Sequence, residues 1–209
     1  MHTVTSKKSD ALIVLVRHGE SEGNTGMILS SNIHALPLIE RGREQALAVS
    51  AELGKLKVDR IVSSPLLRAQ QTAGIISDRL GLGMHEITLD YRLRERGFGY
   101  LEGTIMDDYS WRFRTGQGIE TYDEIANRIN SFLSCAKQGV TVAVTHGDTM
   151  KAAVLSSLGL DELSGFGIRH YNTNMTIIYV QGEKRSLITF GMPVLDESLL
   201  ERIPGRFRA

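Results

Sequence analysis

The sequence lacks three features that would each point to a particular class of protein. Only one of its 209 residues, Cys135, is a cysteine, so no intramolecular disulfide can form, as is usual in a reducing cytoplasm. Its 24 basic and 24 acidic side chains cancel, so no overall charge favours nucleic acid or an anionic membrane. No stretch approaches the roughly 20 apolar residues that a membrane-spanning helix needs. We therefore expect a cytoplasmic protein that binds neither nucleic acid nor membrane.

The sequence also shows no sign of a boundary between domains. There are no internal repeats, low-complexity stretches or charge runs that would mark a linker. The length suits one domain over residues 1–209, with 42% hydrophobic residues to build its core. Within it we expect an irregular segment over about 92–120 that covers a substrate. The tail over 195–209 is amphipathic and then basic, and we expect it to be flexible.

Apolar patterning predicts alternating strands and helices. Continuous apolar runs over 11–16 and 140–144 are typical of strands that are covered on both faces. Gly182-Glu183 lies between two further strands and predicts a hairpin. Shorter strands are expected over 60–62 and 86–89, and helices over 41–56, 66–80, 122–136 and 149–158. This order predicts a three-layer α/β/α sandwich with a mostly parallel sheet and an antiparallel strand.

Two of the expected strands end in the same way. Arg17-His18-Gly19 follows the first apolar run, and Thr145-His146-Gly147 follows the run over 140–144. Because ligands of open α/β sheets bind beyond the carboxyl ends of strands, both histidines should meet at one edge. Glycine at both positions would let the chain turn sharply and let backbone N–H groups approach an anion.

A third motif, Ser63-Ser-Pro-Leu-Leu-Arg68, also follows a short strand and enters a helix. Ser64 is a candidate cap for that helix, with Pro65 in its first position. Arg68 would then lie one turn into the helix and point back to the sheet edge. Together with Arg17 it would form a compact cationic pocket, which a phosphoryl group needs because its charge is spread over several oxygens.

Four motifs together resemble those of the histidine phosphatase superfamily, which contains the cofactor-dependent phosphoglycerate mutases and many phosphomonoesterases. They occur in family order over about residues 11–150. They are Val16-Arg-His-Gly-Glu-Ser-Glu-Gly-Asn24, Ser63-Ser-Pro-Leu-Leu-Arg68-Ala-Gln-Gln-Thr-Ala73, Leu93-Arg-Glu95 through Phe98-Gly99 to Glu102-Gly103, and Thr145-His146-Gly147.

The resemblance implies a phosphoglycerate mutase-like fold and a role for each matching residue. It implies that His18 is phosphorylated during turnover, and Glu95 lies at the position where the family has its proton donor. Binding of the transferring phosphoryl group or the substrate is implied for Arg17, Asn24, Arg68, Arg96, His146 and Gly147. Glu102 lies close to Glu95 in the sequence and is an alternative acid.

Simple chemistry agrees with these roles. A neutral imidazole can accept a phosphoryl group, and two nearby arginines keep His18 neutral. A carboxyl such as Glu95 beside phosphate charge should have a raised pKa, so it can protonate a poor leaving group. No metal is expected, because the arginines supply the positive charge. The histidines could instead be core residues or metal ligands, but neighbouring arginines argue against a cation.

The acceptor of the phosphoryl group from the phosphohistidine distinguishes two possible activities. Transfer to water makes a phosphatase that acts on a small phosphorylated metabolite, and this is the reading we favour. The segment from Arg96 to about Glu120 is short for a mutase, and Asp148 would repel a substrate carboxylate. Transfer to a second phosphorylated acid would make a phosphoglycerate mutase that needs 2,3-bisphosphoglycerate as primer. Trp111-Arg-Phe-Arg114 favours that alternative, since two guanidinium groups could hold a carboxylate.

The remaining expectations concern ligands and partners. A non-catalytic module that binds phosphorylated ligands is a third possibility, although it would not be expected to keep His18, Arg68, Glu95 and His146 together. No cofactor is expected for a phosphatase. A sheet edge or the late hairpin suggests a homodimer, and the aromatic side chains of Tyr109 and Phe113 suit an apolar alcohol portion of the substrate.

Overall fold

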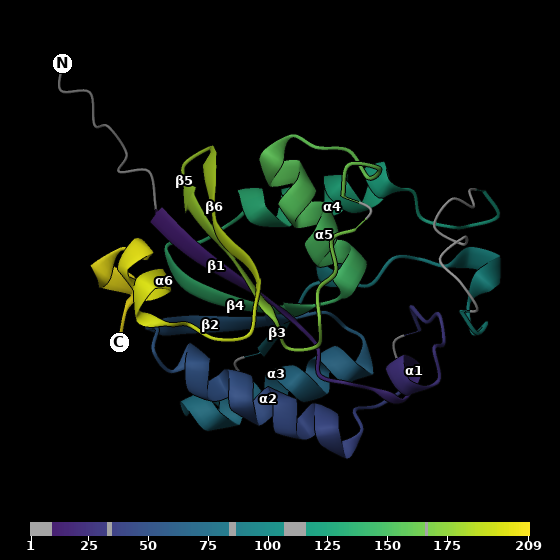
Figure 1. The fold of residues 1–209 in the computed structure, drawn as a ribbon, viewed down its shortest axis with the longest axis horizontal. Coiled ribbons are helices and arrows are strands. Elements are labelled where there is room, and N and C mark those ends of the chain that lie inside the picture. The colour runs from purple at the N-terminus through teal and green to yellow at the C-terminus, as the bar shows by residue number, and fades with distance from the viewer. Residues whose placement is uncertain (1–9, 33–34, 84–86, 107–115, 166) are drawn as a thin grey trace.

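A six-stranded sheet forms the centre of the protein (Figure 1). The structure is a computed structural model, and it describes residues 10–32, 35–83, 87–106, 116–165 and 167–209. The strand order is β3-β2-β4-β1-β5-β6. The strands are β1 (Asp10–Arg17), β2 (Val58–Ser63), β3 (Ile87–Leu89), β4 (Gly139–Thr145), β5 (Met175–Gln181) and β6 (Lys184–Met192).

The strands run in the predicted directions, mostly parallel with one antiparallel strand. β1 pairs in parallel with β4, β4 with β2, and β2 with β3, whereas β5 runs antiparallel to both β1 and β6. Of these six strands, β5 alone therefore opposes the rest. The hairpin between β5 and β6 turns at Gly182, whose φ of +62° lies in the left-handed region that favours glycine. The predicted mostly parallel sheet with an antiparallel strand is confirmed.

Helices cover both faces of the sheet and make three layers (Figure 1). On one face lie α2 (Glu40–Leu53), α3 (Leu67–Leu80) and α6 (Glu197–Arg202). On the other lie α4 (Tyr122–Ser134) and α5 (Gly147–Leu158), and a short helix, α1 (Glu22–Thr25), follows β1. No helix of the described residues is long and apolar enough to cross a membrane.

The unbroken apolar run of β1 packs against both helix layers. Its even-numbered residues 12, 14 and 16 belong to the core cluster beneath α2 and α3, and its odd-numbered residues 11, 13 and 15 belong to the cluster beneath α4 and α5. Because successive side chains of a strand point to opposite faces, a strand covered on both sides must be apolar throughout. Its end is thereby held firmly in the middle of the sheet.

The tail over 195–209, for which we expected flexibility, is instead packed. Leu195, Leu199, Ile203 and Phe207 are buried in the cluster beneath α2 and α3. They recur every fourth residue, a spacing that places side chains on one side of a helical segment. The final residues also pair with the rest of the fold, since the Lys57 N–H donates to the carbonyl of Phe207 over 2.9 Å.

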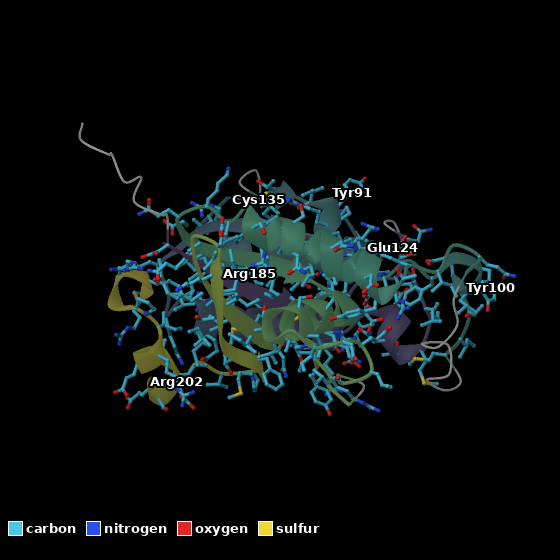
Figure 2. All side chains as sticks on the ribbon, turned by 90° about the horizontal axis from the view of Figure 1, so that it is seen from above. Tyr91, Tyr100, Glu124, Cys135, Arg185 and Arg202 are labelled. Carbon is cyan, nitrogen blue, oxygen red and sulfur yellow. The ribbon has the colours of Figure 1, made fainter. Side chains whose placement is uncertain are left out.

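The irregular segment over about 92–120 is described up to residue 106 and again from 116. It contains the short 3₁₀ helices η2 (Tyr91–Leu93) and η3 (Gly99–Leu101). Figure 2 shows Tyr100 at the outer end of this segment, well away from Cys135 at the end of α4. A small cluster of buried residues holds the segment to the loop after β1, and it consists of Leu29, Phe98, Leu101 and Ile119.

Candidate active site

β1 and β4 end side by side, and a histidine follows each of them. The strands pair in parallel as far as Arg17 and Thr145. The N–H of His18 continues this ladder by donating to the carbonyl of Thr145 over 3.0 Å. The rings of His18 and His146 lie 5.0 Å apart between centroids, and their residues are 2% and 0% exposed. The parallel topology thus places two buried imidazoles together at the carboxyl edge of the sheet.

Gly19 fixes the tautomer of His18. The ring Nδ1 lies 2.7 Å from the Gly19 carbonyl oxygen, which can only accept, so Nδ1 carries the proton. Nε2 then carries the lone pair, and it accepts a hydrogen bond from Arg68 Nε over 3.1 Å. Burial, together with the charges of Arg68 and Arg17, holds the pKa of His18 well below its usual value. His18 is therefore a neutral imidazole with a defined nucleophilic nitrogen.

Arg68 is the second residue of α3, not one turn into it as we expected, and it is 5% exposed. Its Nη2 donates to the carbonyl of Ser30 over 2.8 Å, whereas its Nη1 is buried without a hydrogen-bond partner among the described residues. Burial lowers the pKa of Arg68 to about 10, so the guanidinium stays charged at neutral pH. A buried, charged N–H that lacks a partner is an expensive arrangement, and it is typical of a group that awaits an anion.

Ser64 supports His146 and does not cap α3. The N-cap of that helix is Leu66, which makes no side-chain cap hydrogen bond, so the expected cap at Ser64 is wrong. Instead, Ser64 Oγ lies 2.8 Å from His146 Nε2 and accepts from the Leu66 N–H at 3.3 Å. Burial and the charge of Arg68 lower the pKa of His146 well below its usual value. His146 Nδ1 has no hydrogen-bond partner among the described residues.

Glu95 lies in the pocket wall beside both arginines. Burial raises the pKa of its carboxyl group, and the nearby charge of Asp148 raises it further. The N–H of Arg96, which donates to Glu95 Oε1 over 2.9 Å, and the charges of Arg68 and Arg17 oppose this rise. The net effect favours the protonated acid. Glu102, the alternative acid, accepts hydrogen bonds from residues 31 and 32 and does not line the pocket.

A buried ion pair holds the backbone of Glu95 in place. Arg128 of α4 and Glu120 are 9% and 8% exposed at their side chains, with Arg128 Nε 2.7 Å from Glu120 Oε1. The Nη2 of Arg128 donates to the carbonyl of Glu95 over 3.3 Å. Thr149 of α5 donates to the neighbouring carbonyl of Arg94 over 2.6 Å. The acid is therefore carried on a segment that is tied to both helices of one layer.

Asn24 is fixed by two neighbours. Its Oδ1 accepts from the N–H of Ser21 over 3.1 Å and from Nδ2 of Asn172 over 3.1 Å. Because the oxygen is occupied, the amide NH₂ is the group that Asn24 can offer to a ligand, and the residue lines the pocket. Asn172 also donates to the carbonyl of His18 over 2.9 Å. Asn172 was not predicted, because nothing near it in the sequence resembles a motif.

Residues 170–174, the segment that contains Asn172 and precedes β5, also bind Arg17. The carbonyl of His170 accepts from Arg17 Nη1 over 2.6 Å. The backbone of Arg17 accepts from the Thr173 N–H over 3.0 Å and donates to the carbonyl of Asn174 over 3.2 Å. Thr173 has a φ of +58°, an unusual value for a β-branched residue, and such strain is often found at functional sites. Residues 170–174 therefore help to orient Arg17 and His18, although they lie far from them in the sequence.

A cavity of about 330 Å³ opens over these residues. That volume suits a small metabolite. Among the predicted site residues, the cavity wall includes Arg17, His18, Asn24, Arg68, Glu95 and Gly147. His146 is not part of the cavity wall, although its ring lies 5.0 Å from that of His18. The wall also contains polar residues that the sequence analysis did not select, among them Ser21, Lys151 and His170.

Arg96 is not brought to the cavity, so its predicted contact with substrate is wrong. Its side chain is 3% exposed, with Nε donating to the carbonyl of Glu120 over 2.8 Å and Nη1 2.9 Å from Glu162 Oε1. These partners turn the guanidinium away toward α4 and the end of α5. Arg94 likewise pairs with Glu120, over 2.8 Å, and not with Glu95 or Glu102.

The first motif's glycine has a packing role that we did not expect. A Cβ at Gly19 would lie 2.3 Å from the carbonyl oxygen of Gly42 in α2, so only glycine fits. Its N–H donates to Thr72 Oγ1 over 3.0 Å and so does not face an anion. Gly147, by contrast, is the first residue of α5, where helix N–H groups and the helix dipole favour an anion.

Some predictions fall outside the described residues. They include the aromatic and arginine side chains of Tyr109, Trp111, Arg112, Phe113 and Arg114. Among the residues that are described, no group of three or more His, Cys, Asp or Glu side chains could hold a metal ion.

Comparison with known proteins places this geometry in context. The family model described as "Histidine phosphatase superfamily (branch 1)" matches residues 13–192. A 2,3-bisphosphoglycerate-dependent phosphoglycerate mutase of Thermoplasma acidophilum is 30% identical, over 90% of this chain and 96% of its own length. A Hydrogenobacter thermophilus protein, provisionally named phosphoserine phosphatase 2, is 34% identical over 84% and 93%.

A solved structure with a similar fold is the phosphoglycerate mutase of Bacillus anthracis. It has a TM-score of 0.76 and covers 94% of this chain and 97% of its own. At 17% sequence identity this likeness concerns the fold alone. The predicted phosphoglycerate mutase-like architecture is confirmed.

Proposed function

The chain belongs to the histidine phosphatase superfamily, an enzyme superfamily of phosphatases and phosphoglycerate mutases, and we propose that it is a phosphomonoesterase which works through a phosphohistidine. One observation carries this proposal. His18 is buried and neutral, its Nδ1–H is held by the Gly19 carbonyl, and its Nε2 meets the guanidinium of Arg68. The arrangement thus supplies a nucleophilic nitrogen, a tautomer that leaves this nitrogen unprotonated, and a neighbouring cation for the phosphoryl group.

In the first step, the hydrogen bond from Arg68 Nε to His18 Nε2 breaks, the freed lone pair of Nε2 attacks the phosphorus atom, and the bond from phosphorus to the alcohol oxygen breaks. Arg68 and Arg17 would donate to the equatorial oxygens, and Arg68 Nη1 is a donor with no hydrogen-bond partner in the described part of the chain. If the Ser64 hydroxyl donates to His146 Nε2, the proton of that imidazole lies on Nδ1, where it can reach another phosphoryl oxygen. Asn24 and Gly147 would add the remaining donors.

Glu95 supplies the proton that the leaving group needs. Its raised pKa favours the protonated carboxyl group, from which the proton passes to the departing alkoxide so that the alcohol is released. In the second step water attacks phosphorus, Glu95 takes a proton from that water, and the phosphorus–nitrogen bond breaks. His18 and protonated Glu95 are then regenerated together with inorganic phosphate.

The positive charge at the phosphoryl group comes from two arginines. We propose that hydrolysis needs no metal and no organic cofactor, because Arg17 and Arg68 stabilise the charge that a metal would otherwise neutralise. A mutase would in addition need 2,3-bisphosphoglycerate to prime His18. We further propose a cytoplasmic protein that folds as one domain over 1–209 and forms a homodimer, and that acts on a small phosphate ester.

Hydrolysis is tested with p-nitrophenyl phosphate. Wild type should release p-nitrophenol equally with and without EDTA, and His18→Ala should lose this activity. Circular dichroism of the variant checks that it is folded, and Lys184→Met, at an exposed lysine on β6, is a matched surface control. Release that is the same in wild type and folded His18→Ala would contradict the enzyme and support a module that only binds phosphorylated ligands.

A phosphoglycerate mutase is the second candidate, because the Thermoplasma acidophilum relative carries that name. Phosphatase is favoured by Asp148, which lies in the cavity wall where it would repel the carboxylate of phosphoglycerate. We would incubate the protein with 3-phosphoglycerate, with and without 2,3-bisphosphoglycerate, and follow 2-phosphoglycerate and phosphate. Primer-dependent formation of 2-phosphoglycerate that outpaces phosphate release would establish the mutase.

A further inference from the structure

Phosphoryl transfer leaves three buried titratable residues of the cavity wall without a direct role. Asp148, Lys151 and His170 are 8%, 6% and 5% exposed. Charged side chains are rarely buried to this extent unless they have partners. These three come from two separate elements, α5 and the segment before β5, and converge on one cavity.

Their placement puts them on the leaving-group side. Asp148 and Lys151 are three residues apart in α5, so they occupy the same face of that helix. Asp148 raises the pKa of Glu95, the group that protonates the leaving alcohol, and so lies close to it. Asp148 and Lys151 both act on the pKa of His170 as well. The alcohol part of a substrate would therefore meet all three side chains.

His170 carries the strongest sign of a ligand. Both of its ring nitrogens are buried and have no hydrogen-bond partner among the described residues. Burial, with the charges of Arg17 and Lys151, lowers the pKa of His170 to about 4, so the ring is neutral at pH 7. A neutral imidazole offers one donor and one acceptor. A buried polar group without partners calls for an explanation, and a bound polar ligand is the simplest one.

We propose that Asp148, Lys151 and His170 form a leaving-group subsite for a phosphorylated hydroxy amino acid, whose alcohol part carries both an ammonium and a carboxylate. This rests on the proposed phosphatase. Lys151 would bind the carboxylate, Asp148 the ammonium, and His170 a neighbouring polar atom. A carboxylate alone would leave its charge facing Asp148. A neutral alcohol would offer neither Lys151 nor Asp148 a group of opposite charge, so it would bind this part of the cavity less well.

Four phosphate esters test the ammonium and the carboxylate of the proposed ligand separately. O-Phospho-L-serine has both groups, phosphoethanolamine lacks the carboxylate, 3-phosphoglycerate has a hydroxyl in place of the ammonium, and glycerol 3-phosphate has neither. We expect kcat/KM for phosphoserine to exceed that for each singly altered ester by roughly tenfold to a hundredfold, the range for a hydrogen bond to a charged group. Equal values for all four esters would contradict the subsite.

Two variants assign each charge to its residue. Lys151→Met should erase the preference for phosphoserine over phosphoethanolamine and keep the preference over 3-phosphoglycerate. Asp148→Asn should do the reverse. Each ratio is measured on one variant at one pH, so a general loss of activity cancels. His170→Phe should lower kcat/KM for phosphoserine more than for p-nitrophenyl phosphate, and Lys184→Met on β6 should change no ratio.

Failure of the subsite is distinguishable from failure of the phosphatase. If wild type hydrolyses p-nitrophenyl phosphate through His18 but shows no preference among the four esters, the subsite is wrong and the phosphatase stands. If wild type hydrolyses none of these esters, the phosphatase itself is wrong. Ratios that remain unchanged in Lys151→Met and Asp148→Asn would overturn the residue assignment.

Discussion

Arg68 Nε donates a hydrogen bond to His18 Nε2 over 3.1 Å, so the arginine that would hold a phosphoryl group already touches the attacking nitrogen. Burial and the charge of Arg68 lower the pKa of His18, and the hydrogen bond orients its lone pair. Arg68 is itself fixed by the Ser30 carbonyl at 2.8 Å. One guanidinium therefore links the nucleophile to the phosphate-binding site, and this link leads to our first prediction.

Arg68→Met should reduce kcat/KM for p-nitrophenyl phosphate by roughly 10²- to 10³-fold, the loss expected when one charge-stabilising donor is removed from a reacting centre. Arg68→Lys should recover little of it, because an ammonium lacks the fixed fork of N–H donors with which a guanidinium binds phosphoryl oxygens. Arg79→Lys, at an exposed site on the same helix, is the control. A rate for Arg68→Met close to wild type would contradict the role.

Glu95→Gln should slow hydrolysis of alkyl phosphates by about 10²- to 10⁴-fold and p-nitrophenyl phosphate much less, since only a poor leaving group needs the proton. In wild type, kcat/KM for an alkyl ester should fall as the pH rises through the raised pKa of Glu95. Asp148→Asn removes a charge that raises this pKa, so the fall should move to lower pH. An alkaline limb that stays in place would argue against Glu95 as the acid.

Asn172→Ala should slow phosphorylation of His18 about tenfold, because the amide holds both the His18 carbonyl and the Asn24 side chain. Rapid-quench kinetics measures that step, and a melting curve measures stability. A positioning role predicts a slower step with a small change in melting temperature. The opposite pattern, a large drop in melting temperature with an unchanged phosphorylation rate, would mean that Asn172 is only structural.

Gly19→Ala should destabilise the fold by several kcal/mol, since its Cβ would lie 2.3 Å from the Gly42 carbonyl and the backbone would have to shift. Urea unfolding followed by circular dichroism gives the change in free energy. Gly167→Ala is a matched control, because a Cβ at Gly167 meets nothing within 4 Å. If the two variants unfold at the same urea concentration, the close approach of Gly19 and Gly42 is not important.

Much of the fold could be predicted because its signals are local. The apolar run over 11–16 marks a strand buried on both faces, and Gly81 ends α3 in the left-handed conformation that glycine favours. The meeting of His18 and His146 followed from parallel topology. The tail was misjudged although its apolar residues recur every fourth position from Leu195, because the basic residues that follow suggested a solvated end.

The remaining errors concern side-chain directions, which depend on distant residues. Arg96 belongs to the motif of Glu95, yet it turns to Glu162, whose position depends on how the chain continues after α5. Ser64 looked like a helix cap, but the imidazole of His146, 82 residues away, takes its hydroxyl. Asn172 reaches the site only because β5 lies next to β1. Such partners cannot be deduced from local sequence patterns.

The central claim is a covalent phosphohistidine on His18. The most direct measurement is rapid mixing with a phosphate ester, quenching in alkali where phosphohistidine survives, and peptide mass spectrometry. We predict that wild type carries one added phosphoryl group on the peptide that contains His18, that Glu95→Gln still forms it from p-nitrophenyl phosphate, and that His18→Ala does not. A phosphoryl group on another residue, or rapid hydrolysis by folded His18→Ala, would contradict the account.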